Sequence, residues 1–313
     1  MSAAQPEWRG RAERGSERLL GWMAAASLRL GRPASRIILH IIGSYYFLFA
    51  PAARRAMRGY LERALQHPPR ARDRMRQIMS FATCIHDRLY LLARHGELFR
   101  ITLEGEDVVR EAVGGGPTLL MGAHMGNFEV LRLIGRRYSG FEVSMAMYEN
   151  NARKLNSILG RIAGGAGEAP EIIPVGRVDS MLRLRDSLQS GRLVGVLADR
   201  LFGNEPAVTV NFLGAPARFP SGPMRLAAML RCRVIFMLGL YRGANRYHVI
   251  FASLADFSGL ERAGRAAAVE TAVHRYVALL EQHCRTDPYN WFNFYDFWAA
   301  AASAAVAPAI STS

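Results

Sequence analysis

The stretch with the clearest chemical potential is 117-PTLLMGAHMGNFEVLRLIG-135, in which His124 is followed five residues later by Glu129. A neutral imidazole can take a proton from an alcohol, and a carboxylate beside it can fix its tautomer and stabilise the imidazolium that forms. A histidine and an acid at this spacing are a weak signal alone, so their surroundings decide whether the pair predicts general-base catalysis.

Those surroundings place His124 at the end of a strand. Residues 118–123, TLLMGA, form a short apolar run that is typical of a buried strand. Open α/β sheets bind their ligands at the carboxyl ends of the strands. Gly126 and Asn127 allow a close backbone approach and an exposed helix N-terminus. Glu129 then falls in the first helical turns, within reach of the imidazole.

No nucleophile or metal site accompanies this histidine in the sequence. The G-x-S-x-G pattern is missing, so we expect the acceptor itself to attack. The three cysteines, Cys84, Cys232 and Cys284, lie far apart and form no C-x-x-C pair. They are expected to be small buried side chains in a reducing compartment, and no metal or resident cofactor is predicted.

From residue 101 onward, short strands alternate with helices. The strands are expected at 118–123, 142–147, 171–175, 193–198, 208–213, 233–241 and 246–251. The helices are expected at 127–138, 151–163, 178–190, 221–231 and 264–285. This order predicts an α/β fold with a central, mostly parallel sheet flanked by helices.

A helical region is expected before this domain. Residues 1–18 form a polar tail, residues 19–100 are predicted to be helical throughout with a break at Pro68-Pro69, and the α/β domain covers 101–298. His86 and Asp87, within one of the helices, are expected at the surface. The tail 299–313 is of low complexity and is expected to be disordered.

Residues 37–53, IILHIIGSYYFLFAPAA, form the most apolar segment of the chain. Arg36, Arg54 and Arg55 flank it, and its length is at the lower edge of what a bilayer span requires. We interpret it as a membrane anchor lying in one leaflet, with a buried core helix or a true span as the alternatives.

The net charge of +14 favours acidic partners. All but one of the 40 basic residues are arginines, the exception being Lys154. An anionic membrane surface or an acidic carrier protein suits this charge. Nucleic acid is not expected, because the sequence has no zinc finger, no obvious helix-turn-helix and no RNA-binding signature.

Three blocks of the sequence resemble a known family. The block 122-GAHMGNFEVL-131 resembles the H-x-x-x-x-D/E motif of the lysophospholipid acyltransferase superfamily, in the branch of the late-acting, Kdo-dependent bacterial lipid A biosynthesis acyltransferases. The block 188–227 is similar to that branch through Asp199-Arg200 and 212-FLGAPA-217, and 148–159 through its basic segment. The resemblance covers roughly residues 20–298.

Two features depart from that branch. Arg200 stands where the family has glutamine, and the block 288-PYNWFNFYDFW-298 is unlike the Trp-x-x-x-Arg-Phe ending of the lipid A enzymes. This ending is similar to stand-alone relatives of aryl-polyene and other pigment or lipid pathways. We expect it to cap the core or seal the sheet edge, the alternatives being the lining of an acyl channel or insertion into the membrane.

The resemblance implies a membrane-associated acyltransferase at the cytoplasmic face of the bacterial inner membrane. It would move a fatty acyl group from acyl carrier protein or acyl-CoA, as co-substrate, to a hydroxyl or amine of a lipid-like acceptor. His124 would be the general base, and Glu129 its orienting partner. The resemblance also implies substrate-binding residues: backbone amides near Gly126 and Asn127 for the oxyanion, and the side chains of Arg153, Asp199 and Arg200.

Two other functions are compatible with the same sequence. One is a catalytically silent lipid-binding or scaffold protein of the same fold, which the intact His124 and Glu129 disfavour. The other is a thioesterase that transfers the acyl group to water. For Arg153 a solvated helix face, and for Asp199 and Arg200 a structural role, remain open.

Overall fold

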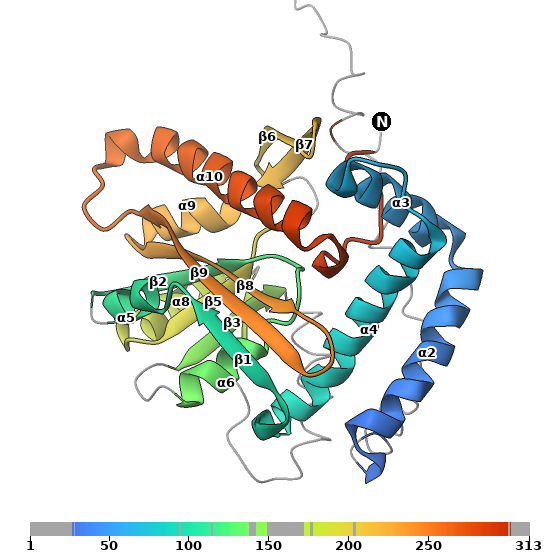
Figure 1. The fold of residues 1–313 in the computed structure, drawn as a ribbon. Helices are drawn as coiled ribbons and strands as arrows, with labels where there is room; N and C mark the ends of the chain where they lie inside the picture. Colours follow the sequence, from blue (N-terminus) through green and yellow to red (C-terminus); the bar gives the residue numbers. More distant parts are fainter. Residues whose placement is uncertain are drawn as a thin grey trace, which may run out of the picture.

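The computed structural model describes residues 27, 29–93, 95–113, 115–137, 142–148, 172–175, 178–202, 205–299 and 301 (Figure 1). The α-helices are α2 Arg32–Phe49, α3 Pro51–Leu65, α4 Ala71–Leu92, α5 Glu106–Val113, α6 Val130–Arg137, α8 Val178–Gln189, α9 Gly222–Met229 and α10 Arg265–Thr286. Short 3-10 helices are η1 Gly96–Leu98, η2 Arg262–Gly264 and η3 Pro288–Asn290. The strands are β1 Arg100–Glu104, β2 Thr118–Gly122, β3 Val143–Tyr148, β4 Ile172–Val175, β5 Leu193–Leu197, β6 Ala207–Phe212, β7 Ala215–Pro220, β8 Arg233–Tyr241 and β9 Arg246–Asp256.

A seven-stranded sheet of order β1-β9-β8-β2-β5-β3-β4 forms the centre of the molecule. Its neighbouring strands are parallel except for β8 and β9, which are antiparallel. Strands β6 and β7 form a separate antiparallel pair. The predicted α/β fold with a mostly parallel sheet and flanking helices is therefore confirmed.

Both faces of the sheet are covered, which explains the continuous apolar runs of its central strands. Along β2, Leu119 and Met121 belong to the hydrophobic cluster that includes residues of α8, α9 and α10. Leu120, between them, points to the opposite cluster, which includes residues of α4, α5 and α6. Figure 1 shows α9 and α10 on one side of the sheet and α5 and α6 on the other.

The predicted strands are all present among the described residues, with some differences in placement. The strand expected at 208–213 is β6, which pairs with β7 outside the main sheet. Strand β9 extends to Asp256 because it forms a long antiparallel hairpin with β8 through a short turn. Strands β1 and β7 and helix α5 were not predicted from the sequence. The helix expected at 151–163 lies outside the described residues.

The N-terminal region contains the expected helices, and the break at Pro68-Pro69 separates α3 from α4. Helix α2 exposes much of its apolar surface, with Ile37 68% and Ile41 67% exposed. The alternative that 37–53 is a buried core helix is therefore wrong. No single helix among the described residues is long and apolar enough to cross a bilayer, whereas α2 and α3 together, bent by 93° at their junction, meet that test by length and composition.

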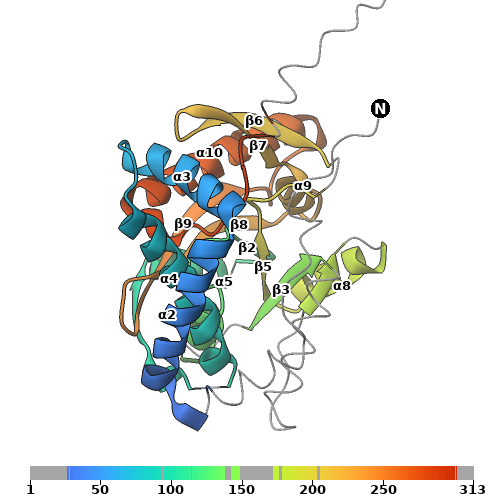
Figure 2. The ribbon, with the colours of Figure 1, turned by 90° about the vertical axis from the view of Figure 1, so that its right-hand side faces the viewer.

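Helix α2 is attached to the rest of the molecule through a buried ion pair. Arg32 donates to both carboxylate oxygens of Asp87 on α4, at 2.6 and 2.8 Å, and Tyr247 of β9 donates to the same carboxylate at 2.7 Å. Figures 1 and 2 show α2 running beside α4. The expectation that His86 and Asp87 lie at the surface is wrong, because both side chains are buried in this contact between helices.

The remaining expectations concern the cysteines and the two tails. Cys84, Cys232 and Cys284 are buried and free, as expected for small apolar side chains. Residues 1–18 and 302–313 lie outside the described residues. Ala299 and Ala301 are helical, and Ala301 is buried. The disorder expected for the tail stays a prediction.

Candidate active site

Two neighbouring strands bring the candidate histidine to a carboxylate. Strands β2 and β5 are parallel and in register from Leu119 opposite Val194 to Gly122 opposite Leu197. The residues that follow them, His124 and Asp199, therefore emerge side by side at the carboxyl edge of the sheet. The Nδ1 atom of His124 lies 2.7 Å from Oδ1 of Asp199.

The carboxylate of Asp199 is fully buried and accepts hydrogen bonds on both oxygens. Oδ1 accepts from the backbone amide of His124 at 3.1 Å and from its Nδ1, and Oδ2 accepts from Trp291 Nε1 at 3.0 Å and Asn293 Nδ2 at 2.9 Å. Burial opposes ionisation, but His124, Arg200 and Asn293 outweigh it and hold the pKa of Asp199 well below its usual range. Asp199 is therefore an anion that only accepts hydrogen bonds.

This arrangement fixes the tautomer of His124. Because Asp199 only accepts, Nδ1 of His124 carries the proton and Nε2 keeps its lone pair. The side chain of His124 is 25% exposed. Burial and the charge of Arg200 lower the pKa of His124 below its ordinary value, against the pull of Asp199. The imidazole is thus neutral at physiological pH and can accept a proton at Nε2.

The C-terminal aromatic block, residues 288–298, runs directly beside residues 123–129, the turn between β2 and α6 that we call the histidine turn. Met125 and Trp291 form an antiparallel bridge, and the amide of Phe292 donates to the carbonyl of His124 at 2.8 Å. The ring of Trp291 is fully buried and packs against Tyr60 and Phe297. The prediction that this block caps the core is confirmed, and its Trp291 and Asn293 also bind Asp199.

Arg200 lies at the same edge and is held by the same block. Its Nε donates to Asn293 Oδ1 at 2.6 Å, and its Nη2 donates to the carbonyl of Phe292 at 3.1 Å. The guanidinium also lies 6.0 Å from the ring centroid of Tyr295. Arg200 therefore places a positive charge close to the His124–Asp199 pair.

The sequence matches the family described as bacterial lipid A biosynthesis acyltransferase over residues 18–299. The chain belongs to this family. The match covers most of the chain and confirms the resemblance seen in the sequence, and the family supports an enzyme that transfers an acyl group from a donor to a lipid acceptor. A search of curated proteins found no match.

Within this acyltransferase, the two amides predicted to bind an oxyanion are engaged in the fold. The amide of Gly126 donates to the carbonyl of Asn290 at 2.9 Å, and that of Asn127 to the carbonyl of Gly239 at 2.7 Å. In this conformation the turn uses both donors, and the oxyanion role predicted for these amides stays a prediction. Gly126 has φ of 70°, and a Cβ there would lie 2.0 Å from the Gly239 carbonyl oxygen, so the position requires glycine.

Glu129 of the family motif is buried in the turn immediately before α6, where its Oε1 accepts from Nη2 of Arg88 at 2.8 Å. The carboxylate bonded to Nδ1 of His124 is instead that of Asp199, which follows β5, the neighbour of β2 in the sheet. Arg88, on α4, was missed because it resembles the other arginines that alternate with apolar residues there. Arg153 lies outside the described residues.

The sequence offered partial signals for the other residues of the site. Trp291 and Asn293 lie in the aromatic block that was singled out, but nothing local in it indicated a contact with Asp199. Among the described residues, no group of three or more His, Cys, Asp or Glu side chains is placed to hold a metal ion.

Proposed function

We propose that the protein transfers a fatty acyl group from an acyl thioester, carried by acyl carrier protein or coenzyme A, to a hydroxyl or amine of a lipid or lipid-like acceptor. The observation that carries the proposal is the 2.7 Å contact between His124 Nδ1 and Asp199 Oδ1 at the carboxyl edge of the sheet. It leaves Nε2 as a base, and the family supplies the reaction class.

The proposed step begins when Nε2 of His124 takes the proton of the acceptor hydroxyl. The acceptor oxygen then forms a bond with the thioester carbonyl carbon, and the carbonyl oxygen becomes an oxyanion. When the oxyanion collapses, the carbon–sulfur bond breaks, and the departing thiolate takes the proton from the imidazolium. Asp199 stabilises the imidazolium between these two transfers without itself becoming protonated.

Cationic side chains suit the anionic groups of both substrates. Arg200 is the described candidate for binding a phosphate or carboxylate of the donor or acceptor, and its contacts with Asn293 and Phe292 hold it at the site. Arg153 stays a prediction for the same task. The net charge of +14 suits an acidic acyl carrier protein and an anionic lipid surface.

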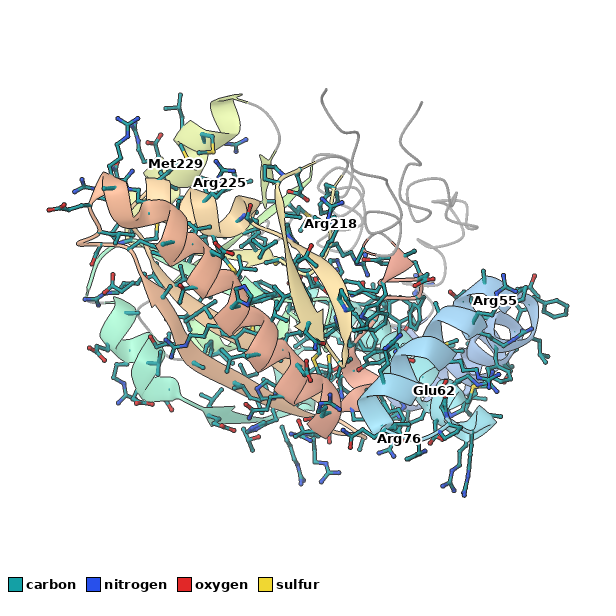
Figure 3. All side chains as sticks on the ribbon, turned by 90° about the horizontal axis from the view of Figure 1, so that it is seen from above. Arg55, Glu62, Arg76, Arg218, Arg225 and Met229 are labelled. Atoms are coloured by element: carbon teal, nitrogen blue, oxygen red, sulfur yellow. The ribbon has the colours of Figure 1, made fainter. Side chains whose placement is uncertain are left out.

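We further propose that the protein works at the cytoplasmic face of the bacterial inner membrane, with α2 as the membrane-contacting element. The proposal is supported by the exposed apolar side chains of α2, which are Ile37, Ile38, Ile41, Ile42, Tyr45, Leu48 and Phe49. The exposed side chains of Arg55 and Arg76, on the adjoining helices α3 and α4, suit anionic head groups (Figure 3).

The test is an assay of purified protein with radiolabelled acyl carrier protein, in the presence and absence of a bacterial lipid extract. Labelled lipid that forms only with the extract supports acyl transfer. Free labelled fatty acid formed equally in both reactions would indicate a thioesterase. If neither labelled lipid nor free labelled fatty acid forms while the donor still binds, a catalytically silent binding protein is favoured.

A further inference from the structure

The acid of the family motif has a cationic partner on another helix. The side chain of Glu129 is 1% exposed, and that of Arg88 is 30% exposed. Both Nε and Nη2 of Arg88 donate to Oε1 of Glu129, at 3.1 and 2.8 Å. Because a buried carboxylate held by two charge-assisted hydrogen bonds is costly to move, this pair fixes the direction of the Arg88 guanidinium.

A second contact fastens the same turn to α4. The Asn127 side chain accepts from the amide of Glu129 at 3.1 Å and donates to the carbonyl of Cys84 at 3.1 Å. Cys84 and Arg88 lie one helical turn apart on α4. The histidine turn is therefore bound to α4 at two successive turns, and Arg88 occupies the position nearer to solvent.

Arg88 lies at the turn that carries the proposed base, because its guanidinium is bonded to Glu129, five residues after His124. Its charge is among those that lower the pKa of His124. A guanidinium has five N–H donors, and the bonds to Glu129 use only the Nε side of the group and one terminal nitrogen. As far as the contacts of the described residues show, Arg88 thus keeps donor capacity at the turn that carries His124.

We propose that Glu129 is a positioning residue that acts through Arg88, and that Arg88 contacts an anionic oxygen of the substrate beside His124. The oxygen belongs either to a phosphate of the donor or acceptor, or to the oxyanion that develops on the thioester carbonyl. This inference rests on the proposed acyl transfer. In this arrangement Asp199, and not Glu129, orients His124. Arg88, which lies outside the family motif, contacts the substrate.

A double-mutant cycle tests this assignment. We would measure kcat and KM for acyl transfer by wild type, Arg88→Met, Glu129→Gln and the double variant. Loss of one preorganised donor costs roughly 10²- to 10³-fold in kcat. If Glu129 acts only through Arg88, Glu129→Gln costs less than about threefold once Arg88 is already Met. A further loss of tenfold or more in that background would overturn the proposal.

The kinetic parameters also distinguish the two sources of the oxygen. A phosphate bound equally in the ground and transition states gives a rise in KM, whereas a developing oxyanion gives a fall in kcat. Arg88→Gln replaces Arg88→Met if the latter fails to fold, because glutamine can still donate to the buried carboxylate of Glu129. Arg88→Lys should recover part of the activity in either case.

A readout independent of turnover is the titration of His124 by nuclear magnetic resonance. Since the charge of Arg88 lowers the pKa of His124, Arg88→Met should raise it. The matched control is Arg32→Met, which removes a cation paired with Asp87, the residue before Arg88 on α4. That variant should lower the melting temperature and leave the titration of His124 in place.

This titration separates failure of the inference from failure of the proposed function. An unchanged titration in Arg88→Met would overturn the inference whatever the activity of the enzyme. If the wild type has no transferase activity but Arg88→Met still raises the pKa of His124, the proposed function is overturned. The substrate contact assigned to Arg88 then falls with it.

Discussion

At the residue scale, the proposed chemistry depends on a histidine whose two ring nitrogens have different partners. Nδ1 is committed to Asp199, and the carboxylate of Asp199 is held in turn by Trp291 and Asn293. Four hydrogen bonds to one buried carboxylate leave it no freedom to rotate or to donate. The direction of Nε2 is therefore fixed by residues that follow β2 and β5 and by residues of the C-terminal block.

Replacing Asp199 by asparagine should remove this control. The asparagine amide cannot accept from all four donors, so the imidazole would adopt the other tautomer or turn away. We expect kcat to fall by roughly 10³- to 10⁴-fold, as for the corresponding change in hydrolase triads. Asp186→Asn, at an exposed carboxylate on α8, is the control and should keep wild-type kinetics. Comparable activity in the two variants would show that Asp199 is not the partner of the base.

The pH dependence of the reaction should report the pKa of His124. The base acts only when neutral, so kcat/KM should fall as the pH drops through that pKa. Because burial and Arg200 lower it, the acid limb should lie below about 6.5, the ordinary imidazole value. Arg200→Met should move the limb upward. A limb above 6.5 in the wild type would contradict the assigned environment.

At the element scale, the site depends on how tightly the histidine turn fits between β8 and the C-terminal block. Gly126 forms a parallel bridge with Gly239 and donates its amide to Asn290. Both contacts need a backbone conformation with positive φ and no Cβ. The close approach of these segments is therefore built on two glycines that face one another.

Gly126→Ala should consequently destabilise the protein. The left-handed conformation alone costs about 1–3 kcal/mol for a residue other than glycine, and the added Cβ would overlap the Gly239 carbonyl. We expect a lowered melting temperature together with loss of transferase activity. Gly191→Ala, in a turn with φ of 81° but open space around it, is the matched control for the conformational part. Equal stability losses in the two variants would refute the close-packing explanation.

The same elements show what the sequence could and could not predict. The strands around the site were predictable because their apolar runs are continuous and end in small or charged residues. The partner of His124 was not, since Asp199 is 75 residues away and meets it only through the pairing of β2 with β5. Glu129 was assigned to His124 by its spacing, whereas its position immediately before α6 allows a bond to Arg88. Helix contacts of that kind depend on crossing geometry, which no local pattern encodes.

At the scale of the whole molecule, the sheet edge that carries His124 and the apolar face of α2 belong to one connected structure. The ion pair of Arg32 with Asp87 ties α2 to α4, and α4 carries Arg88 to the site. Helix α2 is thus attached to the same helix that contacts the histidine turn. A lipid acceptor held at a membrane surface would meet the enzyme on the side of these N-terminal helices.

Membrane binding should therefore depend on α2. We expect the double variant Ile37→Asp, Ile41→Asp to bind vesicles of anionic lipid more weakly by roughly tenfold or more per residue, since burying one such side chain contributes about 1.5–3 kcal/mol. Its folding should change little, because both side chains are exposed. Met229→Asp, on α9 far from α2, is the control (Figure 3). Equal vesicle binding by both variants would exclude α2 as the contact.

The assignment of His124 as the base is tested by comparing wild type with His124→Ala, using radiolabelled acyl carrier protein and a total lipid extract. The melting temperature checks that the variant is folded. Removal of a general base should lower transfer by roughly 100-fold or more. We expect labelled lipid from the wild type and almost none from the folded variant. Equal labelling by the two proteins would contradict this assignment and would reduce His124 to a structural residue at the end of a strand.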